Sequence, residues 1–362
     1  MARPQIIKAA ITIRGGGILG LSAAWALARR GVKVRLIEVA HLGAGPSGGI
    51  VGAMTPHVPE VWNEKKAFQL TSLLMAQGWW DAVAAASGMS TGYGRIGRLQ
   101  AIEDDLAAQM AQTRVAGAQA LWQGQAQWRV IPATGGPWEP VSRTGLLIHD
   151  TLSARIYPRL ALPALAQAIR VMGGEIVFGE AQDHGLTLWA NGLAGLQALA
   201  QAQQRTLSGA VKGQAALLRA NAQGLPQIYA DGLHIVPHDG GLVAIGSTNE
   251  LTWLDPTATD AQLDQLIARA YAALPALRDA PVIERWADLR PRAASRAPVA
   301  GAWPDRPGHF ILNGGFKIGF GMAPLLAEAM ADLILTGRSN LPVSFSPEAA
   351  LARAKPLRPL SV

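Results

Sequence analysis

Three glycines and one acid near the N-terminus have the residue types and the spacing needed to bind a dinucleotide. Gly15 permits a tight turn, Gly17 lets the backbone approach a diphosphate, and Gly20 lets the following helix pack close to the preceding strand. Glu38 follows Gly20 by 18 residues, where a carboxylate accepts hydrogen bonds from both ribose hydroxyls. A carboxylate at this place argues against a 2′-phosphate on that ribose.

The flanking sequence supplies the elements that position these four residues. Ala9 to Ile13 predicts a buried strand, Leu19 to Arg29 a helix that Gly31 stops, and Val32 to Ile37 a second strand. The amides at the start of this helix face the phosphates, and the helix dipole favours their negative charge. Glycine-rich turns are also common as plain connectors, but here the strand, the helix, the spacing and the acid agree. The segment therefore predicts a site for FAD or NAD.

The composition is typical of a globular chain with large buried cores. Of its 362 residues, 49% are hydrophobic and 16% are charged, which suits two domains that share an interface. The net charge of +7 is spread along the chain without a long basic run, so we expect no nucleic-acid partner, although the charge could steer an anionic substrate. The absence of cysteine excludes disulfides, thiolate metal sites, Cys nucleophiles and flavin linkage through sulfur.

The N-terminal segment and the apolar runs bear on the location of the protein. The first strand is reached within about ten residues, which leaves no room for a signal peptide, and no apolar run is expected to approach bilayer length. We therefore expect a cytoplasmic protein without a membrane span. Five tryptophans in amphipathic stretches are expected to pack rather than to bind ligands: Trp62, Trp79, Trp80, Trp122 and Trp128.

Beyond the second strand the pattern alternates between helices and strands. Residues 41–60 are rich in Gly and Pro and predict a loop that crosses the cofactor, and residues 119–145 are rich in Gln, Gly and Pro. The predicted helices are Ala67 to Ala85, Asp104 to about Ala118, Pro158 to Met172 and Asp260 to Leu274, and the predicted strands include Gly97 to Ile102, Gly145 to His149 and Leu186 to Ala190. Strands alternate from 207 to 247, with a hairpin across Asp239, Gly240 and Gly241.

The end of the chain repeats the order of strand, glycine-rich turn and helix, in HFILNGGFKIGFGMAPLLAEAMADLIL. We expect both ends of the chain to fold around one cofactor in a mixed α/β protein, with a discontinuous Rossmann-like FAD-binding domain of residues 1–85, 150–205 and 300–362. Residues 86–149 and 206–299 are expected to form a substrate domain built on an antiparallel sheet. The tail after Ser346 is expected to lie on the surface.

Four blocks resemble the glycine oxidase and D-amino-acid oxidase-like family of flavoproteins, in an order that spans nearly the whole chain. They are RGGGILGLSAAWALARRGVKVRLIE, VKGQ at 211–214, HIVPHDGGLVAIGST, and WADLRPRAASRAPVAG leading to NGGFKIGFGMAP. The resemblance implies FAD, bound non-covalently, and oxidation of an amine next to a carboxylate. Within the family, the chain resembles in particular the short, thiamine-type glycine oxidases.

The resemblance also implies roles for particular residues. Arg290, in the L-R-P motif, corresponds to the arginine that holds the substrate carboxylate, and a guanidinium suits a two-pronged, charge-assisted pair. Arg285, Arg292 and Arg296 lie near it in the sequence and could serve instead. Lys317 corresponds to a basic residue near the flavin pyrimidine, where a cation and the helix expected to begin near Ala323 would stabilise the anionic reduced ring.

Three further residues complete the predicted substrate site. His234 stands where glycine oxidases often carry a tyrosine that helps to hold the carboxylate, which puts the choice of amino acid in doubt. Met54 and His57 fall on the loop over the flavin, although a buried, hydrogen-bonded His57 is about equally expected. His234 and His238 are four residues apart, but Pro237 and the strand pattern argue against a helix and hence against a metal pair, so no metal is expected.

The predicted FAD contacts come from five parts of the chain. They are Gly15, Gly17, Ile18, Leu19 and Gly20, then Glu38 and Val39, then Gly45, Ser47, Gly48 and Gly52, then Ala181, Asn191 and Gly192, and finally Gly314, Phe316, Lys317, Ile318 and Gly319. Two departures from the family pattern stand among them. The connection between Glu175 and Asn191 is too short for the β-meander that relatives insert there, and Arg14 replaces an apolar residue before the first glycine, which suggests a strand end exposed on one side.

The activity implied is oxidative deamination of glycine or a small D-amino acid. Hydride passes to flavin N5, the imine hydrolyses to a keto acid and ammonia, and O2 reoxidises the flavin to give H2O2, although another electron acceptor stays open. The alternatives are oxidation of a secondary amine, such as an N-methyl or cyclic amino acid, and a flavoprotein that acts on a larger partner. Oxidase and dehydrogenase are not distinguished, and self-association into a homo-oligomer is left open.

Overall fold

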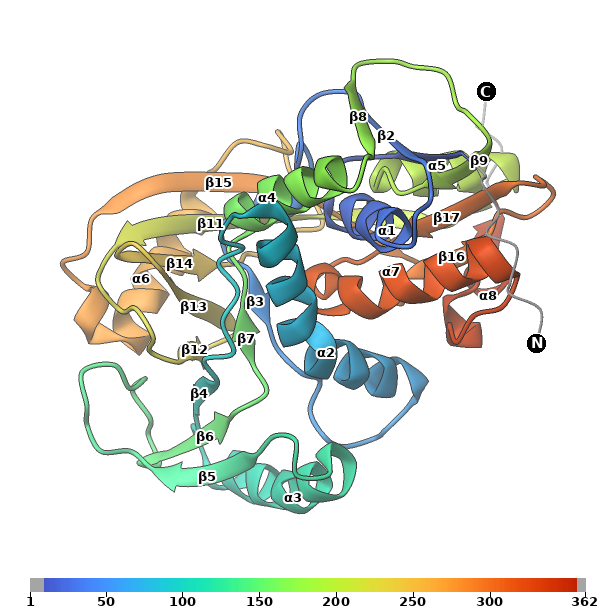
Figure 1. The fold of residues 1–362 in the computed structure, drawn as a ribbon. Coiled ribbons are helices and arrows are strands. Elements are labelled where there is room, and N and C mark those ends of the chain that lie inside the picture. Colours follow the sequence, from blue (N-terminus) through green and yellow to red (C-terminus); the bar gives the residue numbers. More distant parts are fainter. Residues whose placement is uncertain (1–9, 357–362) are drawn as a thin grey trace, which may run out of the picture.

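Two sheets of different kinds organise residues 10–356, the part of the chain that the computed structural model describes (Figure 1). The first is a six-stranded sheet in the order β16-β17-β9-β1-β2-β8. Its strands are β1 (Ile11–Arg14), β2 (Val34–Glu38), β8 (Glu175–Phe178), β9 (Leu186–Trp189), β16 (Val299–Ala302) and β17 (His309–Asn313). All neighbours pair in parallel except β16 with β17, so segments from both ends of the chain share one sheet, as predicted.

Four helices pack together beside this sheet: α1 (Ile18–Ala28), α2 (Glu64–Ser87), α4 (Pro158–Val171) and α7 (Gly319–Thr336) (Figure 1). Every residue of α1 is buried, because α4 and α7 cover what the sheet leaves free. This complete burial explains why α1 is apolar on all sides instead of amphipathic.

Helix α7 alone, among the described residues, is long and apolar enough to cross a membrane by length and composition, with a mean hydropathy of 1.3 over 18 residues. The expectation that no apolar run approaches bilayer length is therefore wrong. In the fold, α7 packs against α1 and α2 and buries Met322, Leu326 and Met330, which is typical of a core helix.

The second sheet has eight strands in the order β15-β11-β14-β13-β12-β4-β6-β5, and only β4 and β12 pair in parallel. Its strands are β4 (Arg98–Ala101), β5 (Trp128–Pro132), β6 (Leu146–Asp150), β11 (Ser208–Arg219), β12 (Gln227–Ala230), β13 (Leu233–His238), β14 (Leu242–Gly246) and β15 (Val282–Ala293). Helix α6 (Ala261–Ala273) packs on one face around Leu218, Ile235 and Leu263. The opposite face carries Ala215 and Trp286 and packs on Ile50.

The remaining elements are short or peripheral. They are α3 (Asp105–Trp122), α5 (Leu193–Ala202), α8 (Pro347–Ala352), β3 (Ala53–Met54) paired with β7 (Ala154–Arg155), and β10 (Arg205–Thr206) paired with β18 (Lys355–Pro356). The structure confirms the mixed α/β class, while the predicted domain boundaries stay a prediction.

Most predicted elements are present with shifted ends. Asp104 and Asp260 cap α3 and α6, accepting the N–H groups of Ala107 (2.7 Å) and Gln262 (2.9 Å). Four of the five tryptophans, all except the half-buried Trp62, are buried, as expected for packing residues. Ala9, the predicted start of the first strand, lies outside the described residues.

Two predictions of local structure are wrong, and two elements were not foreseen. The unforeseen elements are β5, which lies within residues 119–145 and runs beside β6, and α5. Helix α7 begins at Gly319 and not near Ala323, because Pro324 is tolerated inside its first turns. The tail after Ser346 is partly buried in its described part, residues 347–356, since α8 places Ala350 in a core with Leu207.

Candidate functional site

The predicted cofactor residues gather at one edge of the six-stranded sheet. The chain leaves β1, β2, β9 and β17 at the carboxyl ends of parallel strands and enters Gly15–Gly17, Glu38–Val39, Asn191–Gly192 and Gly314–Ile318 respectively. Open parallel sheets bind ligands at this edge. Four segments that are far apart in the sequence therefore meet where a dinucleotide would lie.

The turn after β1 can be built only with glycine. Gly15 has φ +111°, and a Cβ there would lie 2.6 Å from the carbonyl oxygen of Ala190. A Cβ on Gly20 would collide with the carbonyl oxygen of Gly15. These two glycines bring the start of α1 against β1 and β9, as the motif predicts.

Hydrogen-bond donors and one acid line this turn. Gly17 caps α1 without a side chain, no acid lies in the first turn of the helix, and the Ser47 hydroxyl accepts from the N–H of Ile18 (3.0 Å). The buried Glu38 carboxylate accepts from the N–H groups of Gly16 (2.6 Å) and Ala40 (3.0 Å), which fixes it beside the turn. Helix α7 also begins without a side-chain cap or an acid in its first turn.

This donor set fits FAD. The start of α1, where Gly17 supplies no side-chain cap and Ser47 takes the N–H of Ile18, suits a diphosphate. Glu38 suits the ribose hydroxyls, and the uncapped start of α7 suits the electron-rich edge of a flavin. The buried Oδ1 of Asn191, which has no hydrogen-bond partner among residues 10–356, gives a further free acceptor at the same edge.

The shortened connection between β8 and β9 is a single loop of residues 179–185 that Arg14 holds in place. The Arg14 guanidinium pairs with Asp183 (2.8 Å) and donates to the carbonyl of Ala181 (3.2 Å). Arg14 thus ties the end of β1 to this loop. Of the predicted cofactor residues in this region, Val39 is 69% exposed and Ala181 is half-buried.

The loop of residues 41–60 approaches the second sheet closely. It contains a 3-10 turn, Pro46–Gly48, and a Cβ on Gly49 would lie 3.1 Å from the ring of Trp286. Gly52 has φ +61°, and a Cβ there would collide with the carbonyl oxygen of Ile156. A cavity of about 480 Å³ lies between this loop and β15, lined in part by Gly45, Gly48, Trp286 and Asp288.

On the second sheet, Arg290 lies over the backbone of β11. Its guanidinium donates to Ser247 Oγ (2.6 Å) and to the carbonyls of Thr248 (2.7 Å) and Lys212 (3.1 Å), with a long contact from Nε to Val211 (3.5 Å). Burial lowers the pKa of Arg290 to about 10, so that it stays charged at neutral pH. One N–H of Nη1 is left without an acceptor in the described part of the chain, so this arrangement offers a carboxylate one arm of the guanidinium and not the two predicted.

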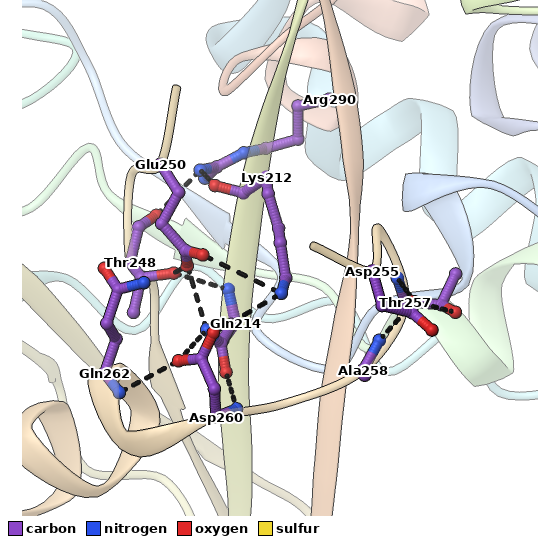
Figure 2. Close-up of polar contacts among 10 residues, drawn as sticks. All are labelled: Lys212, Gln214, Thr248, Glu250, Asp255, Thr257, Ala258, Asp260, Gln262 and Arg290. Atoms are coloured by element: carbon purple, nitrogen blue, oxygen red, sulfur yellow. Dashed lines mark hydrogen bonds and ion pairs between the residues drawn. The ribbon is translucent and has the colours of Figure 1, made fainter. Parts of the chain in front are cut away.

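The opposite face of β11 carries a polar network that fixes the strand and the segment beside it (Figure 2). Lys212 is 2% exposed, and its Nζ lies 3.8 Å from Glu250 Oε2 and 3.7 Å from Asp260 Oδ2. Gln214 Nε2 donates to Glu250 (3.0 Å) and Asp260 (2.7 Å), while the hydroxyl of Thr248 donates to Glu250. Lys212 and Glu250 also exchange both backbone hydrogen bonds (3.0 Å each), so the network holds the carbonyls that orient Arg290.

Three cations surround the ring of Phe316. The guanidinium carbons of Arg290 and Arg292 lie 5.6 and 5.8 Å from the ring centroid, and Lys317 Nζ lies 5.8 Å from it. Partial burial of the ammonium, and then the charge of Arg290, lower the pKa of Lys317, although the residue as a whole is exposed. The structure therefore brings the predicted residues Arg290 and Lys317 together, with Arg292 beside them.

His234 belongs to the same neighbourhood. Burial of the ring, followed by the charges of Arg98 and Lys317, lowers the pKa of His234 to about 3, so that the imidazole is neutral. Its Nδ1 is buried without a hydrogen-bond partner among residues 10–356. The ring packs 4.9 Å from that of Tyr229, which pairs with His234 across β12 and β13.

Two predicted residues are occupied elsewhere. Met54 is 1% exposed and packs in the main hydrophobic core. His57 pairs through its ring Nδ1 and its backbone N–H with Gln69 Oε1, and burial is the largest cause of its lowered pKa. His57 is thus half-buried and hydrogen-bonded, which is close to the second of the two alternatives. His238 is also held, since its Nε2 lies 3.0 Å from the carbonyl oxygen of Ile50.

Sequence reasoning missed Ser247, Tyr229 and the bridging residue Asn313. Asn313 accepts from the N–H of Gly192 (2.7 Å) and donates to the carbonyl of Trp189 (3.1 Å), so it joins the last strand to the loop after β9. Tyr229 could have been found from the hairpin register, because a strand that pairs with β13 in antiparallel fashion places a residue opposite His234.

Comparisons with known proteins show the family of this chain. A family model described as "FAD dependent oxidoreductase" matches residues 10–333. The glycine oxidase of Pseudomonas aeruginosa is 34% identical over 144 residues, which cover 39% of this chain and 39% of that protein. The bifunctional protein ThiO/ThiG of Trichormus variabilis is 24% identical over 359 residues, which cover 91% of this chain and 53% of that protein. The matches thus span about half the length of these relatives or less.

Among solved structures, the fold is similar to that of the glycine oxidase from Geobacillus kaustophilus. The TM-score is 0.81 at 20% identity, covering 93% of this chain and 98% of that one. At this identity the likeness supports the architecture of the two sheets and not the choice of substrate.

Proposed function

Because the chain belongs to the family of FAD-dependent oxidoreductases that its residues 10–333 match, we propose that it oxidises a small amino acid, glycine or a D-amino acid, with non-covalently bound FAD. The observation that carries the proposal is the buried guanidinium of Arg290, which has no carboxylate within 4.0 Å among residues 10–356. A buried cation of this kind suits an anionic ligand. The similarity to proteins named glycine oxidase supports the same substrate class.

The residues around Arg290 would bind and orient such a substrate. Arg290 Nη1 and Ser247 Oγ lie 2.6 Å apart, so the free N–H of Nη1 and the hydroxyl of Ser247 would both donate to one carboxylate. The unpartnered Nδ1 of neutral His234 offers an acceptor to the amine. Bound FAD supplies a ring that accepts a hydride from the carbon bearing the amine. Lys317 and the uncapped start of α7 would stabilise the negative charge that the ring gains.

The test is anaerobic mixing of the purified yellow protein with glycine, D-amino acids, L-amino acids, and N-methyl and cyclic amino acids, while flavin absorbance is followed. Rapid bleaching by glycine or a D-amino acid is expected, and bleaching by secondary amines alone would select that alternative. Recovery of the colour on admitting air would mark an oxidase. No bleaching by any amine, or a protein that binds no flavin, would contradict the proposal.

The variant Arg290→Met tests the role of the guanidinium. Loss of a charge-assisted hydrogen bond is expected to weaken the binding of carboxylate-bearing substrates by about 10- to 100-fold while FAD content is kept. Arg285→Met is the matched control, because Arg285 lies on the same strand but pairs with Asp264 (2.7 Å). Equal effects of the two substitutions would assign Arg290 a general electrostatic role.

A further inference from the structure

We propose that Arg292 forms a second anion-binding subsite beside Arg290, and that the preferred substrate is an amine that carries two acidic groups. This inference rests on the proposed amine oxidation and, for the same site, prefers amino acids with a second acidic group over glycine. The observation that supports it is the arrangement of the two guanidinium groups around Phe316.

The strand places the two arginines on one face. Arg290 and Arg292 are two residues apart in β15, and alternate residues of a strand point to the same side. Their guanidinium carbons lie at nearly equal distances from the Phe316 centroid, 5.6 and 5.8 Å. Both guanidinium groups lie within cation–π distance of the ring, and such a contact uses none of their N–H donors.

The two arginines differ in what satisfies them. Arg290 donates to one hydroxyl and to backbone carbonyls, whereas within residues 10–356 the side chain of Arg292 makes no hydrogen bond and has no carboxylate within 4.0 Å. Arg292 is half-buried, and a guanidinium carries five N–H donors. Arg285 on the same strand is more exposed and is nevertheless paired with Asp264. Arg292 is therefore the better placed of the two to bind an anion.

The balance of charge points to two anions from the substrate. Arg290, Arg292 and Lys317 face one ring, and in the described part of the chain none of the three forms an ion pair. The proposed function gives Arg290 one carboxylate and gives Lys317 the charge of the reduced cofactor. The charge of Arg292 is then unmatched, and a second carboxylate on the substrate would match it.

The test compares diacids with amides of nearly the same shape. The purified flavoprotein is mixed anaerobically with aspartate and asparagine, and with glutamate and glutamine, each as both enantiomers. In one of these pairs the diacid is expected to reduce the flavin with at least about tenfold higher efficiency, and Arg292→Met should abolish that difference while leaving the amide unchanged. The control Arg285→Met removes one charge from the same strand and should keep the preference for the diacid.

Binding without turnover separates failure of this inference from failure of the proposed function. Calorimetry with succinate and with succinamate should show tighter binding of the diacid to the wild type and equal binding to Arg292→Met, even if no amine bleaches the flavin. Equal binding to the wild type would overturn the inference. It would also be overturned if Arg292→Met weakened both ligands alike, or if it lowered FAD affinity, because Arg292 would then serve the first carboxylate or the cofactor.

Discussion

Replacing Lys212 by methionine should destabilise the protein and disturb Arg290 from the far side of the sheet. Methionine keeps most of the volume of the buried stem and removes the charge, so Glu250, whose side chain is 4% exposed, loses its nearest cation. Breaking a buried ion pair on one side costs about 3–5 kcal/mol. Asp260, whose side chain is 48% exposed, can regain water and should add little.

The cost has a ceiling that depends on pH. A carboxylate left alone in this position can take up a proton, and for an ordinary glutamate this costs about 3.7 kcal/mol at pH 7 and about 1 kcal/mol at pH 5. We therefore expect Lys212→Met to lower the free energy of unfolding by about 3–4 kcal/mol at pH 7 and by about 1 kcal/mol at pH 5. The penalty should shrink as the pH falls, because protonation removes the unpaired charge.

Urea unfolding of the FAD-loaded protein at both pH values measures this penalty. The double variant Lys212→Met with Glu250→Gln removes both charges and should recover most of the loss at pH 7. In the same samples, affinity for acetate should fall while FAD content is kept, since the carbonyls of Lys212 and Thr248 orient Arg290. Lys212→Arg should restore acetate binding in part.

Two results would refute this reasoning. A loss below about 1 kcal/mol at pH 7 would mean that Glu250 does not depend on Lys212 for its charge. A double variant no more stable than the single one would mean that packing, and not the ion pair, is lost.

Two further outcomes follow from the same geometry. Gly213→Ala puts a Cβ 2.6 Å from the guanidinium carbon of Arg290 and should weaken acetate binding by about tenfold while FAD content is kept. In the control Gly209→Ala the new Cβ meets nothing within 4 Å, so acetate binding should not change. Equal acetate affinities of the two variants would contradict this prediction. Burial lowers the pKa of His238 to about 4, so as the pH falls below about 6.5 the unfolded chain binds a proton that the folded chain does not bind. Urea unfolding should therefore show about 1–2 kcal/mol less stability at pH 5 than at pH 7, and His238→Gln should remove this difference. The same pH dependence in the variant and the wild type would contradict the prediction.

The cofactor edge was predictable because its requirements are local. Gly15 is demanded by its positive φ, Gly20 by close contact with the carbonyl of Gly15 within the same strand, turn and helix, and Glu38 ends the next strand. The C-terminal unit repeats that pattern, so its place beside β9 follows from the rules of parallel sheets. The missed β5 and α5 lack such signals. Glutamine, glycine and proline flank β5 in the sequence, and α5 follows Gly192 without a side-chain cap.

The substrate face was less predictable because its geometry depends on register between distant strands. Arg290 meets the carbonyl of Lys212 because β11 and β15 pair over residues about 80 apart in the sequence, and no local pattern fixes that register. The VKGQ block indicated the right strand but not which of its residues lie on which face. Gly213 faces Arg290, while Lys212 and Gln214 face Glu250.

That division explains why a lysine and a glutamine flank the glycine. A strand alternates its side chains between two faces, so the neighbours of Gly213, which leaves room for the guanidinium of Arg290, point to the other face of the sheet. Those neighbours can fix the strand only through the opposite face, where Glu250 and Asp260 meet them. Orientation of Arg290 and stability of the sheet are therefore set by the same four side chains, and a substitution that loosens the network should change carboxylate affinity before it changes cofactor content.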